Sequence, residues 1–265
     1  MATFLLVHGA WHGAWCWERL TPLLEARGHK VVAPDLPGMG EDPTPLEDVS
    51  VEQWSEFIAS AARRQDEPVI LVGHSRAGIV VSQAGEYARE SIAALVYLAA
   101  FLVPNGKTLE GVMRQIPARP ESAGSLVMNA DDTTSRIADD AVQRVFFNTT
   151  RPDLVERAKQ LVGAEPMRSF TTPAHLTDAR WGSIPRYYIE CTEDRAIAPA
   201  LQRMMQEKLP CRRAFQLSTD HSPFYSAPEA LTECLDAIAA DVGAVLTSAS
   251  ANSRLPLTSV RYARQ

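Results

Sequence analysis

Pro68-Val-Ile-Leu-Val-Gly-His-Ser-Arg-Ala-Gly78 is the stretch that decides the fold. Its apolar run predicts a buried strand, Gly73 permits a tight turn, and the pattern from Ala77 to Ala88 predicts a helix. A serine at such an elbow stands at the carboxyl edge of a sheet, where the helix N-terminus directs N–H groups toward the hydroxyl. The motif resembles G-x-S-x-G with alanine in the fifth position. Ser75 is the candidate nucleophile; the alternative is a serine that only caps the helix.

Short apolar runs alternate with helical patterns on both sides of this elbow. Continuous apolar strands separated by helices predict a parallel sheet covered on both faces. Ser50, three residues before Gln53, predicts a capped helix start. The expected class is α/β, with about six mainly parallel strands and helices on both faces. The strand-like runs are Phe4–Val7, Lys30–Leu36, Pro68–Val72, Ala93–Phe101, Arg186–Thr192 and Arg213–Ser218.

The alternation of strand-like runs and helical patterns is interrupted once and then resumes. Residues 102–181 are rich in Pro, Asp and Arg, with helical pieces near 135–147 and 153–163, and predict an inserted helical lid. Ordinary long connections are the alternative. The expected core is therefore residues 1–101 and 182–246, with a last helix over Pro228–Val242 and a flexible Ser/Ala-rich tail at 247–265.

Composition narrows the class of function. The chain has 265 residues, a net charge of −6, 46% hydrophobic and 22% charged residues, which fits one globular domain with an insertion. Without Lys/Arg clusters it is expected to bind neither nucleic acid nor an anionic membrane. No stretch approaches 18 apolar residues, and the first residues predict a strand, not a signal peptide. The four cysteines form no C-x-x-C pair, which favours a reducing, cytoplasmic location.

A serine hydroxyl needs a base, which must come from a loop that follows a later strand. Two histidines follow Ser75 in the chain. His175 lies within the lid stretch, away from any strand end, whereas His221 lies in Thr219-Asp-His-Ser-Pro-Phe224, which follows the strand-like run Arg213–Ser218. His221 is therefore the predicted base.

The acid that orients the base should end the preceding strand. Asp194 follows Arg186–Thr192 and is the predicted acid. Glu193 is the fallback, expected to point outward or to pair with Arg195. Glu190 lies inside the strand, and Asp220 adjoins His221, from which an adjacent side chain diverges. The loop at 102–107, another place for the acid, holds no carboxylate.

The loop after the first strand, His8-Gly-Ala-Trp-His-Gly-Ala-Trp15, predicts an oxyanion hole. Its small residues, Gly9 among them, let the backbone approach a substrate. The two donors are expected to be the backbone N–H groups of Ala10 and Arg76. His8 and His12 lack the clustered carboxylate of a metal site, so no metal and no organic cofactor is expected.

These motifs together resemble α/β-hydrolases of the plant methylesterase and hydroxynitrile lyase group and their bacterial esterase relatives. The resemblance covers about residues 3–243. It implies a Ser75–His221–Asp194 triad, oxyanion donors at Ala10 and Arg76, a helical lid over a small apolar pocket, and often a homodimer. The motifs that carry it are 8–15, Gly73-His-Ser75, 180–194 and Asp220-His221.

Two positions favour ester hydrolysis over its alternatives. Hydroxynitrile lyases of this group carry Thr where this chain has Gly9, and a Lys after the catalytic histidine where this chain has Ser222. The expected activity is a serine carboxylesterase for small methyl, aryl or short-chain esters. Cyanohydrin-type carbon–carbon cleavage and non-catalytic binding of a small molecule remain alternatives. Arg76 stands where the group usually has an apolar residue. Its side chain is expected either to be a cation at the pocket rim or to form a solvent-facing ion pair.

The pocket wall is the least determined part of the site. Each of its aromatic candidates could equally pack the lid onto the sheet. The residues predicted to contact a small-molecule ester are Gly9, Trp11, His74, Phe101, Phe146, Trp181 and Phe224.

Overall fold

A computed structural model describes residues 1–117 and 120–252. Its main feature is a six-stranded sheet in the order β2-β1-β3-β4-β8-β9, in which every adjacent pair is parallel. The predicted sheet is confirmed, with β3 in its interior and buried along its whole length. The strands are β1 Thr3–Val7, β2 Lys30–Val32, β3 Val69–His74, β4 Ile92–Leu98, β8 Arg186–Cys191 and β9 Arg213–Leu217.

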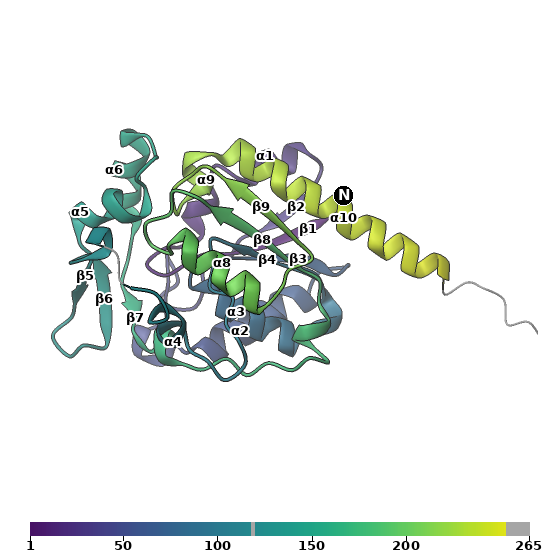
Figure 1. The fold of residues 1–265 in the computed structure, drawn as a ribbon, viewed down its shortest axis with the longest axis horizontal. Helices are drawn as coiled ribbons and strands as arrows, with labels where there is room; N and C mark the ends of the chain where they lie inside the picture. The colour runs from purple at the N-terminus through teal and green to yellow at the C-terminus, as the bar shows by residue number, and fades with distance from the viewer. Residues whose placement is uncertain (118–119, 253–265) are drawn as a thin grey trace, which may run out of the picture.

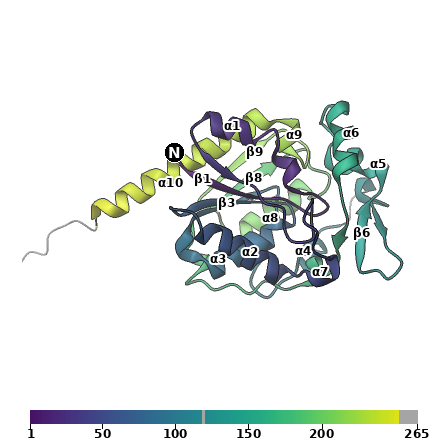
Figure 2. The same ribbon diagram turned by 180° about the vertical axis from the view of Figure 1, so that it is seen from behind.

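Helices cover both faces of this sheet, as the apolar strands require (Figures 1 and 2). Along β1, Phe4 and Leu6 pack into one buried cluster, while Leu5 and Val7 pack into the other. The cluster of Phe4 includes side chains from α1 Thr21–Ala26, α9 Pro223–Ser226 and α10 Pro228–Asn252. That of Leu5 includes side chains from α2 Val51–Arg63, α3 Ala77–Tyr87 and α8 Pro199–Lys208.

Two helix ends test local expectations. The Gln53 N–H donates to Ser50 Oγ at 3.2 Å, which confirms the predicted cap of α2. The last helix was expected to end at Val242, but α10 continues to Asn252 and projects beyond the sheet (Figure 1). The expected flexible tail therefore begins inside this helix, and residues 253–265 lie outside the described residues. No helix of the described chain is both long and apolar enough to cross a membrane.

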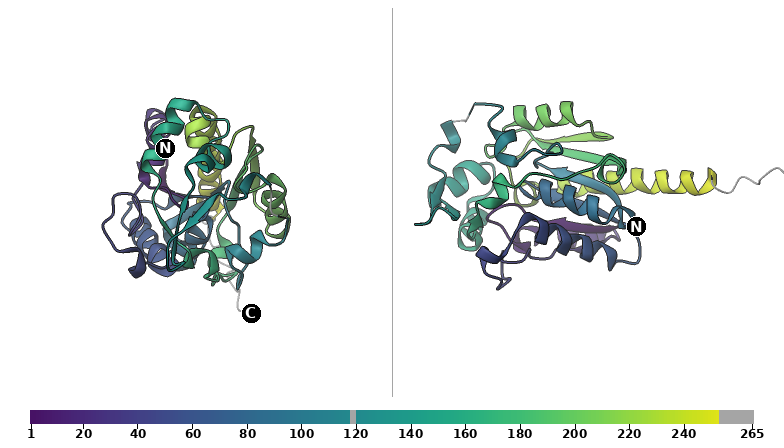
Figure 3. Two further views of the ribbon diagram at one scale, coloured as in Figure 1. Left: turned by 90° about the vertical axis from the view of Figure 1, so that its left-hand side faces the viewer. Right: turned by 90° about the horizontal axis from the view of Figure 1, so that it is seen from below.

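The insertion between β4 and β8, for which the sequence predicts a lid and which is given that name below, gathers at the end of the molecule opposite the projecting part of α10 (Figures 1 and 3). It contains an antiparallel sheet that was not predicted, with β5 Leu126–Met128, β6 Thr134–Ile137 and β7 Glu165–Pro166. The expected helical piece at 135–147 thus begins as a strand. The helical parts are α4 Leu109–Met113, α5 Asp139–Ala141, a π-helix at Val142–Phe146, α6 Pro152–Leu161 and α7 Arg168–Thr171.

The described chain also contains short 3₁₀ helices. They lie at Ala14–Trp17, Leu46–Asp48, Arg89–Ser91, Pro120–Ser122 and Trp181–Ser183. The first of them lies between β1 and α1.

Candidate active site

Ser75 occupies the turn between β3 and α3 with a left-handed backbone, at φ 55°. This conformation is unfavourable for a residue with a Cβ and is retained only where neighbouring groups hold it. The Ser75 N–H donates to the Leu98 carbonyl at 3.2 Å, and the Phe101 N–H donates to the Ser75 carbonyl at 3.1 Å. A Cβ on Gly78 would lie 2.0 Å from the Phe101 carbonyl oxygen. The absence of a side chain at Gly78 therefore allows the chain after β4 to hold the elbow.

His221 and Asp194 form a fully buried pair, with 2.7 Å between Nδ1 and Oδ2. The same carboxylate accepts the N–H groups of Ala196 and Ile197 at 2.7 and 2.8 Å, and the Gln202 amide at 3.0 Å. Because an ionised Asp194 only accepts, Nδ1 carries the imidazole proton and Nε2 is left as the basic nitrogen. Among the described residues His221 Nε2 has no hydrogen-bond partner.

His74 packs against the imidazole of His221. The ring centroids of the two histidines are 4.6 Å apart, and His74 directly precedes Ser75. The His74 Nε2–H donates to the His221 carbonyl oxygen at 2.8 Å, which fixes the loop that carries the base. Burial holds the pKa of His74 well below its usual value, so this ring is neutral. His74 was predicted to contact substrate, but it is not among the residues that line the cavity at Ser75, which is described below.

The loop after β1 approaches Ser75 closely, because a Cβ on Gly9 would lie 2.9 Å from Ser75 Cβ. Within the described chain neither the Ala10 N–H nor the Arg76 N–H donates a hydrogen bond, so both can serve an oxyanion. The His12 ring lies 2.7 Å from the Ala10 carbonyl through Nδ1. No group of three or more His, Cys, Asp or Glu that could hold a metal occurs among the described residues.

Arg76 departs from both expectations for its side chain. It is fully buried, so it lies neither at the rim nor in solvent. Its partner is Glu165 of β7, also fully buried, with 2.9 Å between Nε and Oε1. Its guanidinium carbon lies 4.2 Å from the ring centroid of Trp54 on α2. Arg76 therefore forms a buried ion pair that joins the nucleophile turn to the lid. The sequence did not predict this pair.

A cavity of about 340 Å³ opens above Ser75 and is lined mainly by apolar side chains. Ala10 and the predicted Trp11, Phe101 and Phe146 line it. Gly9, His74, Trp181 and Phe224 are not among its lining residues, so this cavity does not support their predicted contacts with substrate. The wall residues that sequence reasoning missed are mostly in the lid: Glu110, Met113, Ser122, Ser125, Leu126, Val145, Met167, Phe170, Thr171, Ala196 and Ile197.

Two of the misplaced aromatic residues have clear structural roles. The Trp181 Nε1–H donates to the Tyr97 hydroxyl at 3.0 Å inside the core. Phe224 packs edge-on against His74 and Trp17, with ring centroids 5.0 and 5.2 Å apart. Both side chains are apolar enough for a wall or a core, and residue type does not distinguish the two.

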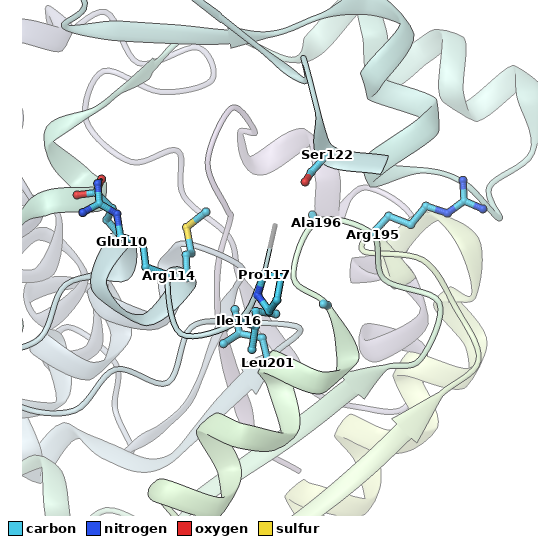
Figure 4. Close-up of a pocket in the computed structure, with 10 residues that line it drawn as sticks. Glu110, Arg114, Ile116, Pro117, Ser122, Arg195, Ala196 and Leu201 are labelled. Carbon is cyan, nitrogen blue, oxygen red and sulfur yellow. The ribbon is translucent and has the colours of Figure 1, made fainter. Parts of the chain in front are cut away.

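A second hollow, of about 490 Å³, adjoins the first and shares Glu110, Met113, Ser122 and Ala196 with it. Figure 4 shows its walls, which come from α4, the turn after Asp194 and α8, with Arg114 and Arg195 among the polar side chains.

The other acidic candidates are engaged elsewhere. Glu190 pairs with Arg203 at 2.7 Å, and Glu193 is exposed. Asp220 accepts the Thr149 N–H at 2.9 Å and the Thr150 hydroxyl at 2.8 Å, so it ties the His221 loop to the lid. Of the acids weighed, Asp194 is the one whose carboxylate lies within hydrogen-bond distance of the His221 ring in the described chain.

Comparison with known sequences agrees with this geometry. Residues 4–233 match the alpha/beta hydrolase family. The chain belongs to this family. Methylesterase 2 of Arabidopsis thaliana is 32% identical over 255 residues, which cover 89% of this chain and 95% of that protein. A pyrethroid hydrolase of Sphingobium wenxiniae is 33% identical over 241 residues, which cover 87% of this chain and 85% of that protein.

Solved structures of alpha/beta hydrolases give the same result. The crystal structure of polyneuridine aldehyde esterase superimposes with a TM-score of 0.81 at 27% identity, covering 90% of this chain and 99% of that one. Relatives at about 30% identity thus include plant methylesterases, a bacterial pyrethroid hydrolase and an alpha-hydroxynitrile lyase of Arabidopsis thaliana.

Proposed function

We propose that this alpha/beta hydrolase, which is esterase-like by its relatives, is a serine carboxylesterase for small methyl, aryl or short-chain esters. The observation that carries the proposal is the strained backbone of Ser75 directly after His74, whose ring centroid lies 4.6 Å from that of His221, the histidine that contacts Asp194 at 2.7 Å. The apolar lining of the 340 Å³ cavity supports small, uncharged substrates. Arg76 pairs with Glu165 and does not line the cavity, so its side chain offers no cation to an anionic substrate.

In the proposed mechanism, His221 Nε2 takes the proton of Ser75 Oγ as this oxygen attacks the acyl carbon. The carbonyl oxygen becomes an oxyanion, which accepts the Ala10 and Arg76 N–H groups. Asp194 stabilises the imidazolium through Nδ1. The ester C–O bond then breaks, the alcohol leaves with the proton from His221, and water hydrolyses the acyl-serine by the same steps.

Cyanohydrin cleavage is the second candidate, because one relative is an alpha-hydroxynitrile lyase. In this chain the two positions that differ are Gly9 and Ser222. A side chain at Gly9 would meet His74 Nδ1 at 2.8 Å and Ser75 Cβ at 2.9 Å, so the threonine of those lyases does not fit without a shift. Ser222 is fully buried and provides no cation for a departing cyanide.

Hydrolysis of p-nitrophenyl acetate tests the proposal, with mandelonitrile cleavage and an ester panel measured in parallel. Ser75→Ala should lower ester turnover by about 10³-fold or more, because the nucleophile is lost. Ser60→Ala on α2, where the serine hydroxyl contacts the exposed Glu56, is the control and should retain ester turnover. Near-normal turnover by Ser75→Ala would contradict the triad. Cyanide release without ester hydrolysis would favour cyanohydrin cleavage as the function. Tight ester binding without turnover would favour a non-catalytic protein that binds a small molecule.

A further inference from the structure

Glu165 is a buried carboxylate that the proposed mechanism does not use. It lies on β7 at the base of the lid, and its side chain is fully buried. A buried carboxylate costs several kcal/mol unless charged and polar partners satisfy it. Its Oε1 accepts the Ser169 hydroxyl at 2.8 Å, while its remaining contacts all go to the two segments that border Ser75.

The first of these segments is the loop that carries Ala10. Glu165 Oε2 accepts the backbone N–H of Trp11, the next residue, at 3.2 Å. Trp11 has a left-handed backbone, at φ 60°, and so needs external support. Two more bonds come from the lid: Gly163 N–H to the Trp11 carbonyl at 2.8 Å, and Trp11 Nε1–H to Ser135 Oγ at 3.1 Å. Ser135 pairs with Glu165 across β6 and β7, so the lid sheet sets the orientation of this loop.

The second segment is the nucleophile turn. Arg76 supplies its backbone N–H to the proposed oxyanion hole and its side chain to Glu165. The Nε–H is not aligned with Oε1, so that 2.9 Å contact is an ion pair, and the hydrogen bond runs from Nη2 to Oε2 at 3.3 Å. Nη2 also donates to the Gly9 carbonyl at 3.3 Å. The guanidinium therefore links the turn, the loop and the lid at one point.

We propose that Glu165 is a positioning residue that fixes, through Trp11 and Arg76, the two backbone N–H groups of the oxyanion hole. This inference rests on the proposed esterase function, because it assigns the oxyanion to Ala10 and Arg76. A misplacement of about 1 Å can lower a rate by about 10²-fold, and loss of one donor lowers it by about 10²–10³-fold. The ion pair is also neutral as a whole, so its carboxylate is compensated near the developing negative charge.

The test compares Glu165→Gln with Glu190→Gln. Both remove a buried carboxylate that pairs with an arginine, but Glu190 faces Arg203 on α8, away from the oxyanion loop. Glu165→Gln should lower kcat for p-nitrophenyl acetate by about 10–100-fold with KM within about threefold, and weaken a trifluoromethyl ketone transition-state analogue by a similar factor. Glu190→Gln should leave kcat within about twofold, although both variants melt at lower temperature. Wild-type kcat in Glu165→Gln would overturn the inference.

A double variant separates positioning from stability, and also serves if Glu165→Gln does not fold. Arg76→Met with Glu165→Met removes both charges at similar volume, a change that often leaves stability unaltered or higher. Such a protein should fold yet keep the loss in kcat of about tenfold or more, because the loop and turn are no longer tied. Restored kcat in the double variant would show that the pair only stabilises the fold.

Hydrogen exchange gives a readout that is independent of ester turnover. Peptides that cover residues 8–13 and 75–77 should exchange about tenfold faster in Glu165→Gln and at the wild-type rate in Glu190→Gln. If the wild-type protein hydrolyses no ester, the proposed function fails, while faster exchange still supports positioning by Glu165. Equal exchange rates in Glu165→Gln and Glu190→Gln would overturn the positioning role of Glu165, whatever the ester turnover.

Discussion

Gly78 is the residue on which the nucleophile turn depends most directly. A methyl group there would lie 2.0 Å from a backbone oxygen of Phe101, which no rotamer change can relieve. We expect Gly78→Ala to lower the free energy of unfolding by about 3 kcal/mol, at the upper end of typical overpacking costs, and to lower kcat because Phe101 N–H holds the Ser75 carbonyl. Urea unfolding and ester turnover measure the two effects.

Gly163 provides a matched control, since a Cβ there would meet nothing within 4 Å. Gly163→Ala should change stability by no more than about 0.5 kcal/mol. If Gly78→Ala is as stable and active as Gly163→Ala, then close packing against Phe101 is not what sets the elbow.

At the residue scale the sequence predicted those positions whose chemistry follows from a strand end. Ser75, Asp194 and His221 each lie in a segment that comes after a strand of the sheet, and parallel strands bring such ends to one edge of the sheet. Their catalytic roles stay predictions. The Arg76–Glu165 pair could not be predicted, because its members lie 89 residues apart and a lone arginine resembles any surface residue.

At the element scale, long buried strands were predictable and the lid sheet was not. A parallel strand inside the sheet is apolar over its whole length, whereas β5, β6 and β7 have two to four residues each and lack a clear period. Aromatic positions were uncertain for a related reason: periodicity locates an apolar face but does not tell whether that face meets core or cavity.

Tyr97 on β4 tests the corrected place of Trp181. Its hydroxyl accepts the Trp181 indole N–H at 3.0 Å and lies 2.7 Å from Ser82 Oγ, so it ties β4 to α3 and to the turn at 181–183. Tyr97→Phe leaves the indole N–H buried and unpaired, which should lower the free energy of unfolding by about 1–3 kcal/mol. Because Trp181 is not part of the wall, kcat/KM of the folded enzyme should stay unchanged.

Phe101→Leu is the comparison for that prediction, since Phe101 does line the cavity. It should alter KM across esters of different acyl size. If Tyr97→Phe shifted the ester preference in the way expected from Phe101→Leu, then Trp181 would belong to the pocket wall after all.

The whole molecule should be sensitive to mild acid, because three histidines are buried in the neutral form. Burial lowers the pKa of His8 to about 3, with Arg76 adding to the shift, and burial lowers that of His12 to about 4. Burial also lowers the pKa of His74 well below its usual value. His8 Nε2 accepts the Leu36 N–H at 3.1 Å, so its protonation would also break a bond. Each ring would titrate near 6.5 once unfolded.

Between about pH 6.5 and 4 the unfolded chain therefore binds protons that the folded chain does not. Stability is fully present above that window and falls as pH decreases through it, by at most about 1.4 kcal/mol per histidine and per pH unit, or about 4 for the three. Urea unfolding at pH 7.5, 6 and 5 measures this slope. His8→Gln should reduce this slope by about 1.4 kcal/mol per pH unit. His175→Gln, at an exposed position, should leave the slope unchanged. A stability that is equal at pH 7.5 and pH 5 would mean that these rings are already charged in the folded protein.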